Sequence, residues 1–233
     1  MKGVRLEIKG EWAQFRRAET NNNPLSHDFI TKTALIGMMG AVLGIERAGM
    51  KDLFPVLSED LKYGVCIKNN VTKHSWGFTL RTVGLAWEKS PKQMEFIRNP
   101  HYEVIIGLQN SRSEKIFADF VEACRKRQAC YEPVLGLHNC PAEIVFMEEG
   151  IISHISQGTF STQGFVTSKH QLTGDLGNMN FHLGFDKVPT FQNNDFWNVP
   201  ESFVSVIYPS NGNELKISGE YYMFNNKSQW CLI

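Results

Sequence analysis

The alternation of apolar and polar positions along the first 150 residues predicts strands that are interrupted by two amphipathic helices. Residues 4–9 alternate cleanly, which is typical of a half-buried strand. Further strands are expected at four places: 63–68, 78–87, 102–108 and 142–147. A basic polar connection at 69–77 and a polar excursion at 91–100 separate some of them. The resulting order is strand, helix, strand, strand, helix, strand, which is the ferredoxin-like pattern.

The first predicted helix, at residues 29–47, has large apolar side chains on one face and glycines on the opposite face. Inside a helix each glycine costs about 1 kcal/mol relative to alanine. The stripe of Gly37, Gly40 and Gly44 therefore indicates that another element approaches closely, and Gly49 is expected to end the helix. A membrane span needs about 20 apolar residues, so this run is too short. We interpret it as a core helix whose first turn can attract an anion.

The second predicted helix covers residues 111–127, where Ser111 and Glu114 have the spacing of a capping box. From residue 150 onward the composition shifts to Ser, Thr, Asn, Gln and Gly, and short strands separated by turns are expected. Residues 210–213 have the composition of a hairpin turn between two of these strands. The chain is therefore predicted to be α+β, with a ferredoxin-like (RRM-like) domain at 1–148 and a β-rich domain at 149–233.

The distribution of charge along the chain says more about possible ligands than the net charge does. The 233 residues carry no net formal charge, which argues against a general nucleic-acid binder. Residues 61–87, however, contain Lys, Arg and His but no Asp or Glu, so a locally basic surface is expected inside a neutral total. Five widely spaced cysteines without a CxxC pair favour reduced thiols in a cytoplasm. The alternating N-terminus is unlike a signal peptide, so a cytoplasmic protein without a membrane anchor is expected.

The sequence lacks the motifs of several common enzyme classes. It contains no P-loop, no GxSxG and no HExxH, and its seven histidines do not have the spacing of metal ligands. We therefore predict no catalytic residues, no metal site and no cofactor.

Four segments have the composition needed to contact a phosphate backbone. They are the predicted strand end at 15–17, the helix start at 31–33, the basic connection at 68–76 and the turn at 136–139. Arg and Lys supply charge, Asn and Thr supply hydrogen bonds, and His or Trp can stack on unpaired bases. The candidate RNA-binding residues are Arg16, Arg17, Thr31, Lys32, Thr33, Lys68, Asn69, Lys73, His74, Trp76, Arg81, Gly136, His138 and Asn139.

These segments resemble a known family. The chain has FRR after its N-terminal strand, then TALIGMMGAVLGIER, FIRNPHYEVIIGL and YEPVLGLHNCPAEIVF. Together they are similar to the Cas-five family of CRISPR Cascade complexes, which are repeat-associated (RAMP superfamily) proteins with a ferredoxin-like core. The resemblance covers residues 1–150 well and is closest in style to type I-B.

The resemblance implies a non-catalytic subunit that grips the 5′ handle of the CRISPR RNA in antiviral defence. Such a subunit caps the backbone filament, abuts the first backbone subunit and the large subunit, and meets target DNA only indirectly. It also implies a β-hairpin "thumb", which would fall at about 68–102 in this chain. Arg16, Arg17, Lys32, Lys73 and Arg81 would then contact phosphates, and His74 and Trp76 would stack on or fix bases.

Two alternatives stay open at this point. One branch of the family, from type I-C systems, cuts precursor RNA without a metal through a Tyr-Lys-His set, for which Tyr63, Lys73 and His74 are the candidates here. Lys169-His170 is the other Lys-His pair. The second alternative is a purely structural subunit whose basic segment docks a protein partner.

Overall fold

A computed structural model of the chain describes residues 1–20, 23–82, 85–173, 181–194 and 199–233, with only backbone described for strand residues between 80 and 90. Its centre is an antiparallel sheet with the strand order β13-β12-β7-β1-β6-β3. Four adjacent strands of this sheet are β7 (Glu143–Thr162), β1 (Lys2–Lys9), β6 (His101–Leu108) and β3 (Leu61–Ile67). Val4, Leu6 and Ile8 of β1 are fully buried, as the predicted alternation requires.

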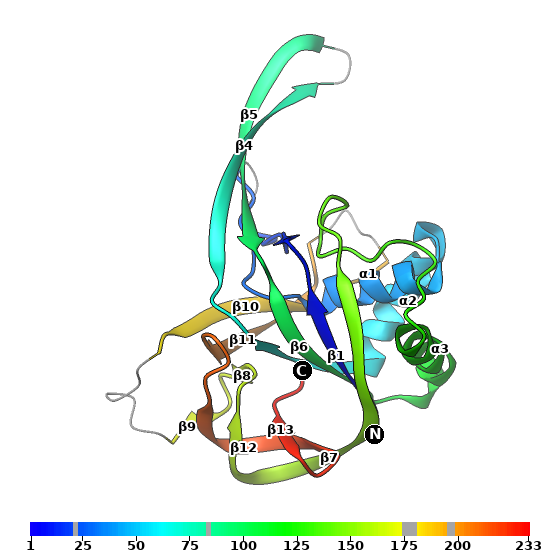
Figure 1. Cartoon of the computed structure of the whole chain (residues 1–233), viewed down its shortest axis with the longest axis vertical. Coiled ribbons are helices and arrows are strands. Elements are labelled where there is room, and N and C mark those ends of the chain that lie inside the picture. The colour runs from blue at the N-terminus through cyan, green and yellow to red at the C-terminus, as the bar shows by residue number, and fades with distance from the viewer. Residues whose placement is uncertain (21–22, 83–84, 174–180, 195–198) are drawn as a thin grey trace.

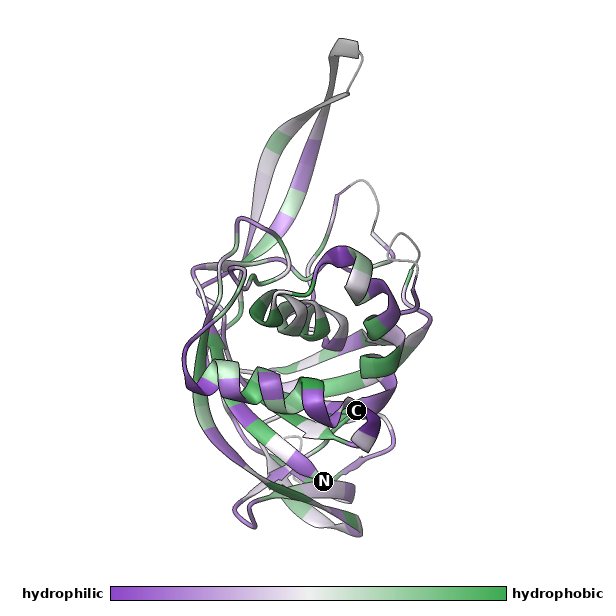
Figure 2. Cartoon of the chain, turned by 90° about the vertical axis from the view of Figure 1, so that its right-hand side faces the viewer, coloured by the Kyte–Doolittle hydropathy of each residue, from purple (hydrophilic) through white to green (hydrophobic). Residues whose placement is uncertain are grey.

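Three helices cover one face of this sheet (Figures 1 and 2). They are α1 (Lys32–Leu43), α2 (Arg47–Asp60) and α3 (Glu114–Arg125), and a short 3₁₀ turn, η1 (Ser111–Ser113), precedes the last. The apolar stripe of α3 is buried at Phe117, Phe120, Val121 and Cys124. The chain thus has mixed α and β structure and is rich in strands, as predicted at the level of fold class.

The first predicted helix is shorter than expected and is followed at once by a second helix that was not predicted. Helix α1 ends at Gly44, which has the left-handed φ of 70°, and Gly49 lies inside α2 rather than at a helix end. The glycine face of α1 is covered by α2, because a methyl group at Gly40 would collide with the Met50 side chain. The predicted close approach is therefore made by a helix that the sequence pattern missed. The predicted capping box is also wrong, because Asn110, not Ser111, accepts the capping hydrogen bond, from the N–H of Arg112.

A long hairpin of β4 (Thr72–Thr82) and β5 (Leu85–Arg98) projects from the body and is joined at its base by β2 (Trp12–Ala13) (Figure 1). It lies within the range 68–102 expected for a thumb. The predicted polar connection at 69–77 is mostly strand β4, and the polar excursion at 91–100 is mostly strand β5. A strand that projects into solvent has no buried face along its length, so the hydrophobic alternation of a half-buried strand is weak there.

The C-terminal part continues the central sheet and adds a second one. Strand β7 runs through position 148, where the two predicted domains meet, and pairs with β12 (Leu215–Phe224). Strand β12 in turn pairs with β13 (Ser228–Trp230) and with β9 (Gln171–Leu172). Strands β10 (Leu183–Phe191), β11 (Ser202–Pro209) and β8 (Val166–Thr167) form a separate sheet. The turn at 210–213 exists, with positive φ at Asn211 and Gly212, but it links strands of different sheets, so the predicted hairpin is wrong. None of the described helices has the length and apolar character needed to cross a membrane.

Candidate nucleic-acid interface

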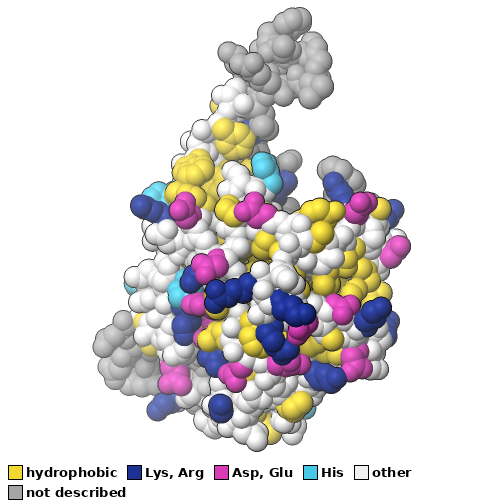
Figure 3. Space-filling view, turned by 45° about the vertical axis from the view of Figure 1, so that its right-hand side comes forward, with side chains coloured by type: hydrophobic (Ala, Val, Ile, Leu, Met, Phe, Trp, Pro, Cys, Tyr) yellow, Lys and Arg dark blue, Asp and Glu magenta, His cyan; other side chains and the backbone are white. Residues whose placement is uncertain are grey.

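One face of the hairpin carries aromatic side chains. Because side chains alternate along a strand, His74, Trp76 and Phe78 of β4 share a face, and His74 stands opposite Phe96 of β5. At the base of the hairpin the ring of Trp12 contacts Trp76 with 4.5 Å between centroids, and Trp76 contacts Phe96 at 4.7 Å. Trp76 and Phe78 remain 41% and 37% exposed. Hydrophobic side chains accordingly extend from the body onto the hairpin in the space-filling view (Figure 3).

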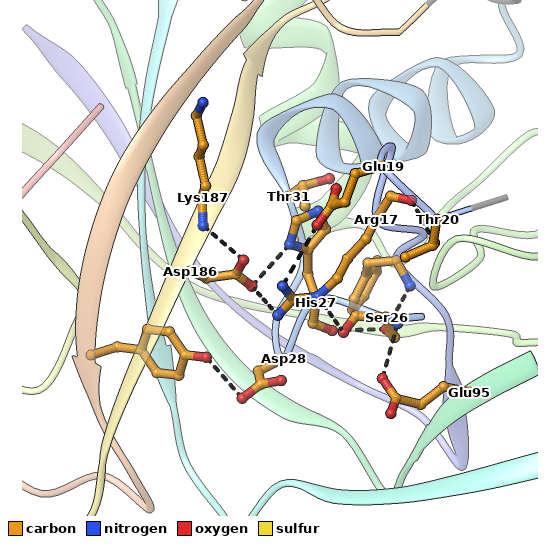
Figure 4. Close-up of polar contacts among 12 residues, drawn as sticks. Arg17, Glu19, Thr20, Ser26, His27, Asp28, Thr31, Glu95, Asp186 and Lys187 are labelled. Carbon is orange, nitrogen blue, oxygen red and sulfur yellow. Dashed lines mark hydrogen bonds and ion pairs between the residues drawn. The ribbon is translucent and has the colours of Figure 1, made fainter. Parts of the chain in front are cut away.

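The opposite face of the hairpin base is polar and is bound to the loop that precedes α1. Lys73 Nζ lies 2.7 Å from a carboxylate oxygen of Asp28 and 3.0 Å from one of Glu95, and it donates a hydrogen bond to the carbonyl of Ser26. The same Glu95 accepts from the backbone N–H of Ser26. Tyr208 donates to the other oxygen of Asp28 at 2.8 Å. These contacts fix the base of the hairpin to the body, and Figure 4 shows those that Glu95 makes with Ser26 and that Asp28 accepts from strand β11.

A buried ion cluster extends this network to strand β10. Asp186, whose side chain is almost fully buried, accepts from Nδ1 of His27 at 2.9 Å and pairs with Arg17 at 3.0 Å (Figure 4). Burial alone would raise the pKa of Asp186. The hydrogen bond and charge of His27, together with Arg17, instead hold that pKa below its ordinary value.

Several predicted phosphate contacts are therefore already paired with carboxylates. Arg17 pairs with Asp186, Lys73 with Asp28 and Glu95, and Lys68 Nζ lies 3.4 Å from Glu103. Asn69 donates its side-chain amide to the carbonyl of Asn99. The fold therefore positions these side chains, and each already has a hydrogen-bond or ion-pair partner within the protein.

Arg16 and Arg81 differ from that group. Arg16 is exposed and donates only to the carbonyl of Thr20 among its described contacts, so its charge faces solvent. Arg81 lies in β4, and its side chain is outside the described part of the chain.

The predicted helix start at 31–33 is mostly buried. The Thr31 hydroxyl caps α1 by accepting from the N–H of Ala34, and it also contacts the hydroxyl of Thr33. Lys32 is 5% exposed and donates from Nζ to the carbonyl of Ser58 at 2.8 Å. Burial, with a smaller contribution from repulsion by Lys62, lowers the pKa of Lys32 to about 8. Lys32 is also one of the residues that line a cavity beside the sheet β10-β11-β8.

In the predicted turn at 136–139, the backbone geometry requires a glycine at position 136. Gly136 has φ +93°, and a Cβ there would overlap the carbonyl oxygen of Gln14. The turn is held against β2 by a hydrogen bond from the N–H of Gln14 to the carbonyl of Leu135. His138 and Asn139 are exposed on the same turn, so a ligand can reach their side chains.

The candidate cleavage set is not assembled among the described residues. Tyr63 is fully buried in β3, its hydroxyl has no described hydrogen-bond partner, and burial raises its pKa above the ordinary range. Lys73 is engaged by two carboxylates, and Nε2 of His74 is buried beside Trp12 without a described partner. Within the described residues no group of three His, Cys, Asp or Glu side chains could hold a metal ion.

Sequence reasoning missed Trp12, Phe78 and Phe96 as members of the aromatic face. The signal for Phe78 was present, because His74, Trp76 and Phe78 recur at every second position, which is the period of one strand face. This two-residue period was overlooked because residues 69–77 were interpreted as a polar connection and not as part of a strand. Trp12 and Phe96 come from distant positions, and only the pairing of β2 with β5 brings them together.

Comparison with known proteins identifies one family model and several solved structures of similar fold. A family model described as CRISPR-associated protein (Cas_Cas5) matches residues 3–166. A crystal structure of a CRISPR protein from Archaeoglobus fulgidus is similar over 95% of both chains, with 14% identity and a TM-score of 0.57. A chain of a CRISPR RNA-guided surveillance complex is similar over 89% of this chain and 90% of its own, with 14% identity and a TM-score of 0.51. No curated protein matches the chain. The family match extends from β1 to β8 and includes the whole hairpin, so this chain belongs to the Cas-five family of CRISPR-associated proteins.

Proposed function

We propose that this chain is a subunit of a CRISPR effector complex and binds the 5′ handle of the CRISPR RNA without cleaving it. The observation that carries the proposal is the projecting hairpin, whose aromatic face leaves Trp76 and Phe78 partly exposed while its opposite face is fixed to the body. Membership of the family supports it, as does the similarity in fold to a chain of an RNA-guided surveillance complex.

The chemistry of this face suits single-stranded RNA. Unpaired bases stack on aromatic side chains regardless of their identity, with about 1–3 kcal/mol per base. Arg16, His138 and Asn139 are exposed and can contact phosphates or base edges. Because Arg17, Lys68 and Lys73 are already paired, we infer that stacking contributes more to affinity here than phosphate contacts do. The salt dependence of binding by the isolated chain should therefore be shallow.

The finer parts of the proposal follow from the family resemblance. The core is a ferredoxin-like domain, which the order β7-β1-β6-β3 with helices on one face supports. The subunit belongs to a cytoplasmic type I-B complex, caps the backbone filament beside the large subunit, and meets target DNA only indirectly.

The endoribonuclease alternative receives little support from the geometry. A base and a cation must both reach the 2′-OH and the scissile phosphate. Tyr63 is fully buried and is not presented to RNA, and the ammonium of Lys73 is already engaged by Asp28 and Glu95. Incubation of the protein with precursor transcript and a chelator tests this directly. A product with a defined 5′ end that is lost in His74→Ala would contradict the non-catalytic proposal.

The proposed RNA contact is tested by substitution of the two exposed aromatic residues. Trp76→Ala and Phe78→Ala should each raise the Kd for a labelled repeat-derived 5′ handle RNA about tenfold, which corresponds to the loss of one stacked base. Phe185→Ala is the matched control, because this phenylalanine is 67% exposed on β10, which belongs to a different sheet from the hairpin. Fluorescence anisotropy at fixed salt measures all four proteins.

Wild-type affinity in both hairpin variants would contradict the stacking role. If the assembled complex also gave no crosslink between this subunit and the handle, the docking-subunit alternative would be favoured instead.

A further inference from the structure

A cavity of about 600 Å³ lies between the start of α1, the chain end after β13 and the sheet β10-β11-β8. Its volume is in the range of small-ligand sites. Hydroxyl-bearing side chains supply much of its polar lining, namely Ser58, Ser156, Thr167, Ser168, Thr190 and Ser202. These groups can donate hydrogen bonds to an oxygen-rich ligand.

The charged groups of this cavity are unbalanced. Lys32, Lys62 and Lys169 line it, whereas Glu220 is the one carboxylate among its described lining side chains. Glu220 Oε2 lies 3.8 Å from Nε2 of His154. No described carboxylate lies within 4 Å of any of the three ammonium groups, in contrast to Arg17 and Lys73 at the hairpin base.

Lys32 is the most unusual of the three, because it is almost completely buried. An ammonium group has three N–H donors, and the one acceptor described for Lys32 is the carbonyl of Ser58. Buried charges in proteins are normally paired. The low pKa of Lys32, caused first by burial and then by Lys62, is the electrostatic consequence of this missing partner.

We propose that this cavity binds a phosphate-bearing ligand. The ammonium groups of Lys32, Lys62 and Lys169 would bind its anionic oxygens. The proposal stands independently of RNA binding by the hairpin. The phosphate can belong to the handle RNA or to a free nucleotide or inorganic phosphate, since all present the same anionic oxygens to the lysines and hydroxyls.

Thermal unfolding of the full chain in inorganic phosphate, at ionic strength matched with chloride, tests the site. Phosphate at about ten times its Kd should raise the wild-type Tm by about 3 °C or more. Lys32→Met should abolish this rise, and Lys62→Met or Lys169→Met should weaken it. Lys115→Met is the matched control, because it removes an exposed lysine of α3 that does not line the cavity.

The stability of Lys32→Met without phosphate is a second readout. Replacing an unpaired buried ammonium by an apolar side chain of similar length should leave the Tm in chloride unchanged or raise it. If Lys32→Met does not fold, Lys62→Met and Lys169→Met carry the test. Absence of a phosphate-dependent rise in the wild type, or an equal rise in the cavity variants, would overturn the proposal.

Binding of the labelled handle RNA then identifies the source of the phosphate. If Lys32→Met weakens RNA binding and phosphate competes with RNA, the occupant is an RNA phosphate. If RNA binding is unchanged while the phosphate effect is lost, the occupant is a free nucleotide or phosphate. Either result supports the site, and the Trp76 and Phe78 variants report on the hairpin separately.

Discussion

Among single residues, Gly136 shows how a candidate RNA contact can have a purely conformational requirement. Its φ of +93° is in the region that favours glycine, and a Cβ would meet the carbonyl oxygen of Gln14. If the turn moved to relieve the unfavourable φ or the clash, the hydrogen bond between Gln14 and Leu135 would be strained or broken. The glycine is therefore needed for the turn to dock on β2, whatever the turn binds.

We predict that Gly136→Ala lowers the free energy of unfolding by about 2 kcal/mol, because it combines an unfavourable φ with a backbone clash. Gly77→Ala is the matched control, since a Cβ at Gly77 has open space around it and its φ is unremarkable. That control should be neutral or slightly stabilising. Urea denaturation of both variants measures the difference, and equal stability would show that the turn can move away from β2.

The charged residues show what single positions in a sequence do not reveal. Lys73 was predicted as a phosphate contact from its place in an acid-free run, yet Asp28 and Glu95 neutralise it from 45 and 22 positions away. Arg17 meets Asp186 across 169 positions. The partners of both side chains depend on tertiary contacts that no local pattern contains.

At the scale of elements, the Asp186 cluster joins two segments that are distant in sequence, the stretch between β2 and α1 and strand β10. His27 belongs to the loop before α1, Arg17 to the chain after β2, and Asp186 to β10 of the second sheet. The cluster thus holds the N-terminal loop against the C-terminal part. Since Asp186 is almost fully buried, loss of its charge leaves Arg17 and His27 without their shared acceptor.

We predict that Asp186→Asn destabilises the protein by about 2 kcal/mol at neutral pH, which is typical of a lost hydrogen bond to a charged group. Because the folded pKa of Asp186 lies below its ordinary value of 3.8, this stabilisation is present above that pH and is lost as the pH falls through the folded pKa. The difference between wild type and variant should therefore be smaller in acid, below pH 3.8, than at neutral pH.

Glu19→Gln is the control for this prediction, because Glu19 is an exposed carboxylate 3.8 Å from the same Arg17. An exposed ion pair contributes at most about 1 kcal/mol. Denaturant unfolding at both pH values measures the two variants. Equal effects of Asp186→Asn and Glu19→Gln would contradict a structural role for the buried cluster.

The predictability of elements follows the burial of their faces. Strand β1 and helix α3 bury one face each, and β6 is buried along nearly its whole length. Their apolar patterns predicted all three closely. Helix α2 was missed because it buries little beyond Met50 and Leu57 and contains Pro55. The hairpin strands were predicted only in part, since both of their faces meet solvent over much of their length. Sheet membership after β8 could not be predicted, because it depends on pairings between distant strands.

In the whole molecule, the body and the hairpin are stabilised in different ways. The body is a continuous hydrophobic core under the helices, whereas the described contacts of the hairpin with the body are confined to its base. A long structure that buries little surface contributes little to folding free energy. Its length is therefore better explained by a contact with another molecule than by stability.

This division predicts that the outer hairpin can be removed without unfolding the protein. Trp76 and Met94 are paired across the hairpin, so replacing residues 77–93 by Asn-Gly closes it with a two-residue turn and keeps the aromatic base. The Tm should change by less than about 2 °C. Affinity for the handle RNA should fall at least as much as in Phe78→Ala, because the variant loses Phe78 and all residues beyond it. A large fall in Tm would show that the outer hairpin stabilises the body, and unchanged RNA affinity would place the RNA contact elsewhere on the molecule.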